Sequence, residues 1–278
     1  MTTQYLLLDG VRYKQALTRL YGRDDQLEIE PLYCGTPWQE VADIGPILIK
    51  PGPRSSLFAE SESSQEWQHS SALLVSASAM ADVANHLRQL NKVSDVTGSE
   101  SLLRYADPLV ARFLLGSYSP AGLRQILGPV NEWRIAEPKY PWLPRTDLDW
   151  HVFTSQEAAS QEPVERLGQA QMKALEKAYC WQLKERLYTW LQTNQPVDLT
   201  RLTNTDIDGW FDERLGSADA FGLTSERSIA IWCALSLRYG NDFAAVDDGT
   251  YQRWLTGQKG GRLHTADQRL QQYYQESV

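Results

Sequence analysis

Long apolar runs and paired cysteines are both missing from this sequence. No apolar run approaches the roughly 20 residues that a transmembrane helix needs, and the first residues lack the basic segment and apolar core of a signal peptide. The three cysteines, Cys34, Cys180 and Cys233, are far apart and form no CxxC pair. Scattered thiols of this kind are typical of reduced cytosolic proteins. We therefore expect a cytoplasmic protein with no membrane insertion.

Motifs for catalysis, nucleotides or metals are also missing. The four histidines, His69, His86, His151 and His264, have no second histidine at HxH or HxxxH spacing, which argues against a zinc site. The sequence has no GxSxG, GxxxxGK[ST] or GxGxxG pattern, so no common nucleophile elbow or phosphate loop is indicated. We expect no cofactor, no metal and no catalytic residue.

An excess of positive charge is absent as well. The 278 residues carry a formal net charge of −8, and the isoelectric point is near 5.1. This balance argues against nucleic acid or an anionic membrane surface as the partner. What is abundant is aromatic: ten Trp and thirteen Tyr suit large cores and protein–protein interfaces.

The pattern of apolar residues changes character near the middle of the chain. Before residue 137, short β-prone runs alternate with amphipathic segments, which predicts an α/β region. The expected strands are 5–8, 27–33, 45–50, 72–75, 101–105 and 132–135, and the expected helices are 11–21, 79–91, 108–115 and 120–127. After residue 163 only helical patterns remain, and the expected helices are 164–192, 206–215, 225–239, 250–255 and 263–274.

These patterns predict an α/β N-terminal lobe over residues 1–137 and an all-α C-terminal lobe over residues 163–278. Between them, residues 138–162 hold Pro138, Pro141 and Pro144 with Tyr140 and Trp142, followed by a polar loop. Prolines this closely spaced predict a stiff connector.

The stretch 102–115 turns from a short buried strand into a helix. Asp107 stands where an N-cap belongs, and Pro108 follows at the first helical position. A capping carboxylate accepts free N–H groups of the first turn, and proline has no N–H to leave unpaired there. Arg104 lies three residues before Asp107, so we expect the two to pair across the turn. This pair suggests either a structural corner or an anion-binding or catalytic site, and the structural corner is the expectation that we favour.

Arg104-Tyr-Ala-Asp-Pro108 resembles the R-[FY]-x-D-P signature of the bacterial type VI secretion effector adaptors, also called effector chaperones. Further segments resemble that family in the same order: 7–10 (Leu-Leu-Asp-Gly), 32–36 (Leu-Tyr-Cys-Gly-Thr), 45–48 (Gly-Pro-Ile-Leu), 86–88 (His-Leu-Arg), and 128–130 (Gly-Pro-Val) with Trp133. The second half resembles the family only through residues 240–243, Gly-Asn-Asp-Phe.

The resemblance implies a cytosolic adaptor that binds one effector toxin and helps load it onto the trimeric spike protein of the secretion apparatus. It ascribes no catalysis to the chain, and it marks Asp9, Gly10, Arg104, Asp107 and Pro108 as family residues with a structural role. Two alternatives stay open: a hydrolytic enzyme that uses the strand-end carboxylates Asp9 and Asp107, and an immunity protein that neutralises a toxin.

Trp181 and Tyr188 are the candidates for a partner contact in the helical lobe. They lie seven residues apart, which is two helical turns, so they share a face. Lys177 and Lys184 lie beside them, as rim charges of such a contact. Two hypotheses follow for the aromatic pair: an anchor for the toxin, since exposed Trp and Tyr dominate interfaces, or a second core face covered by other helices.

Overall fold

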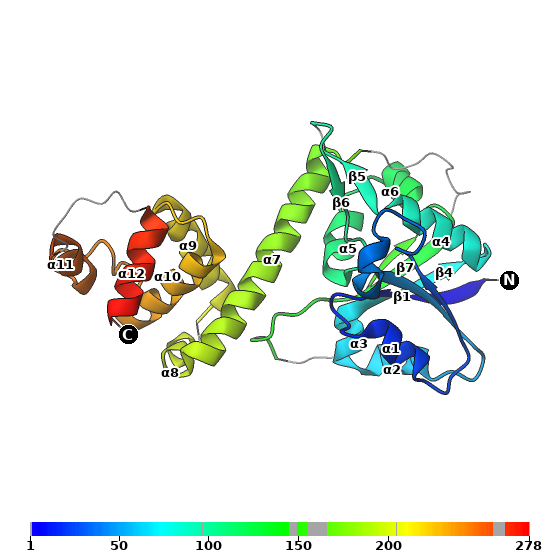
Figure 1. The fold of residues 1–278 in the computed structure, drawn as a ribbon, viewed down its shortest axis with the longest axis horizontal. Helices are drawn as coiled ribbons and strands as arrows, with labels where there is room; N and C mark the ends of the chain where they lie inside the picture. Colours follow the sequence, from blue (N-terminus) through cyan, green and yellow to red (C-terminus); the bar gives the residue numbers. More distant parts are fainter. Residues whose placement is uncertain are drawn as a thin grey trace. The chain divides into compact units, whose positions relative to one another are not determined.

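The computed structural model describes residues 2–95, 97–144, 149–154, 166–203, 205–257 and 265–277 (Figure 1). The chain divides into two compact units. The sheet unit comprises Met1–Lys139 and Leu143–Ala178, and the helical unit comprises Tyr140–Trp142 and Tyr179–Val278. The predicted fold class is confirmed, because strands mixed with helices occupy the first half and helices follow from α7 onward.

A six-stranded antiparallel sheet forms the centre of the sheet unit, in the order β2-β3-β1-β4-β7-β8. The strands are β1 (Thr3–Asp9), β2 (Leu27–Pro31), β3 (Pro46–Pro51), β4 (Ser71–Ser76), β7 (Val130–Ala136) and β8 (Trp150–Thr154). The edge strand β2 ends in Pro31, where the missing N–H group costs no ladder bond.

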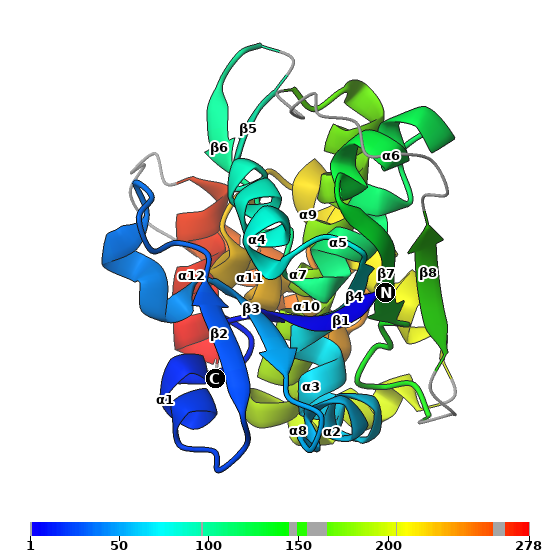
Figure 2. The same cartoon turned by 90° about the vertical axis from the view of Figure 1, so that its right-hand side faces the viewer.

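Side chains of β1 alternate between two cores, one on each face of the sheet. Tyr5 and Leu7 belong to one core, and Leu6 and Leu8 belong to the other. The first core is covered by α4 (Met80–Gln89), α5 (Pro108–Leu115) and α6 (Pro120–Leu127), and the second by α1 (Ala16–Tyr21), α2 (Leu57–Ser63) and α3 (Gln65–Ser70) (Figures 1 and 2). A central strand buried on both faces is therefore apolar along most of its length.

Three local expectations for the sheet unit need correction. The helix expected over 11–21 is only α1, because Gln15 adopts the left-handed conformation with φ 56° and the preceding residues form turns. The buried strand expected over 101–105 is the exposed strand β6 (Glu100–Leu102), which among the described residues pairs only with β5 (Lys92–Ser94). The segment expected to be a connector includes β8, which extends the main sheet beside β7.

The helical unit is built on α7 (Gln169–Asn194), whose residues from Tyr179 onward belong to it. The other elements of this unit are α8 (Pro196–Leu199), the 3₁₀ turn η2 (Thr200–Leu202), α9 (Ile207–Ala220), α10 (Glu226–Tyr239), α11 (Thr250–Gly257) and α12 (Ala266–Ser277). A second 3₁₀ turn, η1 (Gln39–Ile44), belongs to the sheet unit. Helix α10 is the most buried, with Ile231, Trp232, Cys233 and Leu235 all in the core. No helix among the described residues has the length and apolar character needed to cross a bilayer.

The long helix begins later than its sequence pattern suggests. Residues 164 and 165 lie outside the described residues, Arg166 forms an isolated bridge with Ser94, and α7 starts at Gln169. Residues 155–162, expected as a polar loop, and His264 also lie outside the described residues. Along α7, Leu183, Leu187 and Leu191 are buried, whereas Tyr179 is 56% exposed.

Candidate functional site

The site begins at the turn that follows β1. Asp9 ends the strand, and its Oδ1 accepts hydrogen bonds from the backbone N–H groups of Val11 and Arg12, both at 2.9 Å. Gly10 lies against the backbone of the turn before β3, so that a Cβ at this position would come within 2.6 Å of the Gly45 carbonyl oxygen. The Asp-Gly pair therefore fixes a tight turn with the carboxylate folded back onto it.

The second part of the site is the start of α5. Asp107 is the N-cap, its Oδ1 accepts from the Leu109 N–H at 3.0 Å, and Pro108 occupies the first helical position. The predicted cap is confirmed. The Asp107 side chain has no exposed surface, so any charge on it must be compensated by protein groups.

Arg104 joins the two parts. Its Nη2 lies 3.0 Å from Asp9 Oδ1 and 2.9 Å from Asp9 Oδ2, whereas its approach to Asp107 Oδ2 is longer, at 3.4 Å. The closer partner of Asp107 is Arg12, whose Nε lies 2.9 Å from Oδ2. The expected ion pair between Arg104 and Asp107 is therefore present, and Arg104 makes a second, shorter one with Asp9, 95 residues away in the sequence.

We call Asp9, Arg12, Arg104 and Asp107 the signature network. It contains two carboxylates and two guanidinium groups, so its charges balance. Burial raises the pKa of Asp9 above its ordinary value; Arg104 opposes that effect, and the neighbouring Asp107 adds to it. The network therefore holds one carboxylate whose ionisation is costly unless Arg104 stays beside it.

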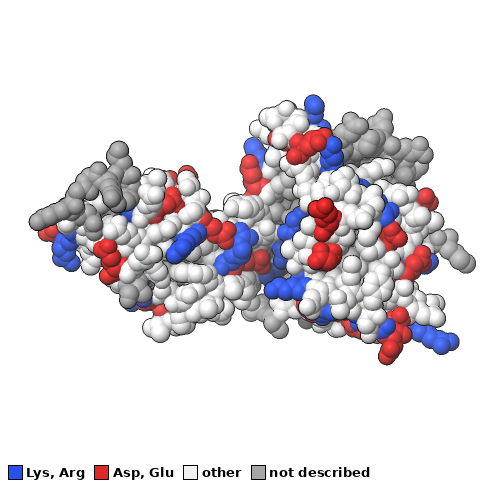
Figure 3. All heavy atoms as spheres, viewed as in Figure 1, with Lys and Arg blue, Asp and Glu red and all other residues white. Residues whose placement is uncertain are grey.

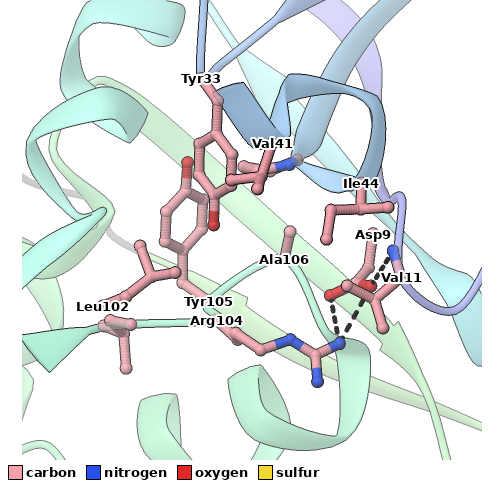
Figure 4. A pocket seen from close by; sticks show the side chains of 11 residues that line it. Asp9, Val11, Tyr33, Val41, Ile44, Leu102, Arg104, Tyr105 and Ala106 are labelled. Atoms are coloured by element: carbon pink, nitrogen blue, oxygen red, sulfur yellow. Dashed lines mark hydrogen bonds and ion pairs between the residues drawn. The ribbon is translucent and has the colours of Figure 1, made fainter. Parts of the chain in front are cut away.

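A pocket of about 190 Å³ opens next to the network (Figure 4). Its walls are almost wholly apolar, and Asp9 and Arg104 lie at one side. Tyr33 directs its hydroxyl into the pocket, whereas the hydroxyl of the buried Tyr105 points away from Arg104 (Figure 4). Burial, reinforced by the charge of Asp9, raises the pKa of the Tyr33 hydroxyl, so Tyr33 is a neutral donor and acceptor near neutral pH.

Both carboxylates of the signature network are already engaged by protein groups. Both carboxylates already accept hydrogen bonds from backbone N–H groups and lie against guanidinium groups. A general base needs a free lone pair within reach of its substrate, and Asp107 has no exposed surface to offer one. Within the described residues, no group of three or more His, Cys, Asp or Glu is placed to hold a metal ion.

The aromatic candidates of α7 lie together in the helical unit. Trp181 and Tyr188 are both partly buried: Trp181 stacks on Tyr140 with a centroid separation of 3.7 Å, and Tyr188 lies 5.0 Å from Trp142. The rings from residues 140–142 therefore cover this face of the helix, which gives weight to the core interpretation.

The two lysines differ from each other. Lys177 is exposed, whereas Lys184 is 5% exposed and its Nζ lies 2.6 Å from Asp208 Oδ1 and 2.7 Å from Asp212 Oδ1. The expectation that Lys184 is a rim charge is therefore wrong. Burial lowers the pKa of Lys184, but the hydrogen bonds to the two aspartates outweigh that effect and leave the pKa raised.

Sequence reasoning predicted Asp107 and Pro108 as a helix start beside Arg104, and it joined Asp9 and Gly10 to them only as family residues. The structure places all five in one site. Sequence reasoning missed Arg12, and it included Tyr33 only within the family-like segment 32–36. Arg12 lies three residues after Asp9, a spacing that could have suggested a charged turn, but its partner Asp107 is remote in sequence. The family-like segment 32–36 does not itself predict that Tyr33 lines the pocket, because that depends on the packing of the loop before β3.

Residues 4–125 match the model of a family described as a domain of unknown function, DUF4123. The match covers less than half of the chain. It includes the whole signature network and the pocket, and it excludes β7, β8 and the helical unit. No curated protein and no solved structure gives a significant match.

Proposed function

We propose that this chain is a non-enzymatic cytosolic adaptor that binds one effector toxin and helps load it onto the trimeric spike protein of a bacterial type VI secretion system. The observation that carries the proposal is the convergence of the Leu7–Gly10 and Arg104–Pro108 motifs, which the adaptor resemblance singles out, in one closed network of the DUF4123-matching domain. Residues held together by ion pairs and a helix cap stabilise the fold. An adaptor needs such a stable scaffold to present its binding surfaces.

The two units suit two kinds of partner. A spike protein is a common part of the apparatus, so a surface that recognises it belongs in the family-like sheet unit. Each adaptor must also select its own toxin, and selection needs contacts that differ between partners. We place that private surface in the helical unit, which lies outside the matched residues 4–125.

On the face seen in Figure 3, the distribution of charged side chains does not indicate a nucleic-acid partner. Among the described residues on that face, Lys and Arg are interspersed with Asp and Glu and with uncharged surface. A protein that tracks a phosphate backbone gathers its basic residues into a stripe. This distribution, with the net charge of −8, favours a protein partner.

The proposal is tested by co-purification from the native cells followed by mass spectrometry. We expect the tagged full chain to retain a spike protein and a toxin, and we expect deletion of its gene to abolish secretion of that toxin while leaving the cells resistant to it. Loss of resistance with secretion intact would identify an immunity protein instead.

One observation favours the enzymatic alternative enough to test it. Asp9 has a raised pKa and borders a pocket, which is how acid–base residues often present themselves. The Asp9→Asn variant keeps the shape of the side chain and removes its charge. Toxin delivery that survives in folded Asp9→Asn excludes a catalytic Asp9, and delivery lost in a folded variant with both partners still bound would support catalysis.

A further inference from the structure

The rim of the pocket beside the signature network is unusually apolar for surface. Four of its side chains are large hydrophobic groups that are exposed by 40–47%: Val11, Val41, Ile44 and Leu102. They come from the turn after β1, from η1 and from β6, three segments that are distant in sequence. Single exposed apolar residues are ordinary, but a cluster of them around a pocket marks a binding surface.

Polar groups without partners lie at the same place. Arg104 uses only Nη2 toward the carboxylates, and its Nε is a buried atom with no hydrogen-bond partner. Within the described residues, Arg104 Nη1 and the Tyr33 hydroxyl also make no hydrogen bond. A mostly apolar pocket with a few polar groups directed at it is the usual form of a ligand site.

We propose that this pocket binds one apolar side chain, together with its adjoining peptide group, from an internal segment of a partner protein. The side chain fills the apolar interior between Tyr33, Ile44 and Leu102. The backbone carbonyl accepts a hydrogen bond from Arg104, and the backbone N–H donates to the Tyr33 hydroxyl. This proposal deepens the proposed function, because it gives the chemistry of the partner segment that binds here. It rests on the proposed function in one respect, namely that the ligand is a protein.

Size and charge select this ligand over others. Small-molecule pockets usually measure about 300–1,000 Å³, and this one, at about 190 Å³, suits a single side chain. The charges of the signature network already balance, so a free carboxylate would meet Asp9 without a spare cation. A peptide group is neutral and carries one acceptor and one donor, which matches the Arg104 N–H groups that make no hydrogen bond and the Tyr33 hydroxyl.

Synthetic peptide units test the inference on the purified full chain. The probes are N-acetyl-leucine methylamide, N-acetyl-serine methylamide and N-acetyl-leucine with a free carboxylate, and binding is followed by ligand-observed NMR and by the Arg104 Nε–H resonance. We expect the leucine methylamide to bind with a Kd on the order of 1 mM, as its few atoms allow, and to shift the Arg104 signal. The serine probe should bind at least about tenfold more weakly.

Two variants locate the binding. Tyr33→Phe removes one hydrogen bond and should weaken binding of the leucine methylamide by about two- to tenfold. Ile44→Asp places a charge on the pocket rim, at a side chain that is 47% exposed. It should weaken binding of the leucine methylamide by at least about tenfold. Val246→Asp is the matched control, a 50% exposed valine of the helical unit, and should leave binding unchanged.

Several results would overturn the inference. They are no saturable binding of the leucine methylamide up to its solubility limit, equal binding of the serine probe, tighter binding of the free carboxylate, or loss of binding in Val246→Asp but not in Ile44→Asp. A dimer that Ile44→Asp converts to a monomer in sedimentation would reassign the pocket to a contact between two copies. Because these assays use the isolated chain, their failure is separate from failure of the co-purification.

Discussion

Asp107 combines a helix cap with an ion pair, and a single substitution removes both. In Asp107→Ala the N–H of Leu109 loses its acceptor and Arg12 loses its carboxylate. A lost cap costs about 1 kcal/mol, and an orphaned, partly buried cation adds about 1–2 kcal/mol. We expect the free energy of unfolding to fall by about 2–3 kcal/mol, measured by urea denaturation.

Ser119→Ala is the matched control for the cap alone. Ser119 caps α6 through a hydrogen bond from the Gly122 N–H at 3.3 Å, and it makes no ion pair. We expect a loss of about 1 kcal/mol. Equal losses in the two variants would mean that the Asp107–Arg12 pair contributes nothing.

His86 predicts a pH dependence of stability. Its Nε2 lies 2.8 Å from the Ile126 carbonyl oxygen, and its ring covers Gly128 so closely that a Cβ there would come within 2.3 Å of it. Burial lowers the pKa of His86 below 6.5, and the Ile126 hydrogen bond only partly opposes this. The unfolded chain therefore takes up a proton below about pH 6.5 that the folded chain does not.

It follows that the free energy of unfolding falls as the pH drops below about 6.5, by at most about 1.4 kcal/mol per pH unit for this one group. His86→Gln should remove that slope, measured as the difference between the two proteins in denaturation series from about pH 7.5 to about pH 5.5. His151, whose pKa is also lowered by burial, is present in both proteins and cancels. Parallel curves would mean that folding does not change the pKa of His86.

The sequence allows prediction of residue roles only where the chemistry is local. The Asp107 cap follows from four neighbouring residues, because the groups that it joins are adjacent in the chain. The Arg104–Asp9 pair crosses 95 residues, and no spacing rule reaches that far. Of the two carboxylates that pair with Arg104, only Asp107 is near it in the sequence, and it is the farther one in space.

Two glycines illustrate opposite consequences of the same substitution in two elements. Gly10→Ala forces a Cβ to within 2.6 Å of the Gly45 carbonyl oxygen and must displace the turn that positions Asp9. Gly216 lies inside α9 with open space around its Cβ position. We expect Gly10→Ala to destabilise the protein by more than about 1 kcal/mol, and Gly216→Ala to stabilise it by about 0.5–1 kcal/mol, both seen in thermal unfolding.

The aromatic face of α7 gives a prediction at the level of the helix. Because Trp181 stacks on Tyr140 and Tyr188 lies against Trp142, Trp181→Ala with Tyr188→Ala should lower the free energy of unfolding by roughly 2–4 kcal/mol. Tyr179→Ala, on the same helix and 56% exposed, should change it by less than about 0.5 kcal/mol. A double variant of unchanged stability that loses toxin binding in a pull-down would restore the anchor hypothesis.

Elements with strong periodic patterns and clear ends are predictable from this sequence. Helices α5 and α6 begin at Pro108 and Pro120, and both starts are marked by a capping residue and a proline. Strand β8 follows a proline-rich segment and is only half-buried, so its own pattern is weak. It becomes a strand because it pairs with the edge of β7, which would otherwise be unpaired. Residues 150–154 alone do not show that such an edge is available.

At the scale of the whole molecule, each unit has its own apolar cores. Every member of the two cores on either side of the sheet belongs to the sheet unit, and every member of the other two belongs to the helical unit. Segments with separate cores open as separate cooperative units. The sequence predicts this division through the change from mixed to helical patterns, but not that Tyr140–Trp142 joins the helical unit, since that depends on ring stacking.

Hydrogen exchange followed by mass spectrometry tests the independence of the two units in the full chain. Asp107→Ala weakens only contacts within the sheet unit, so we expect faster exchange in β1, β4 and α5 and unchanged exchange in α9 and α10. The Trp181→Ala and Tyr188→Ala double variant should produce the converse pattern. If either variant instead accelerates exchange in both units to the same extent, the chain unfolds as one cooperative body, and a division of partners between two units loses its physical basis.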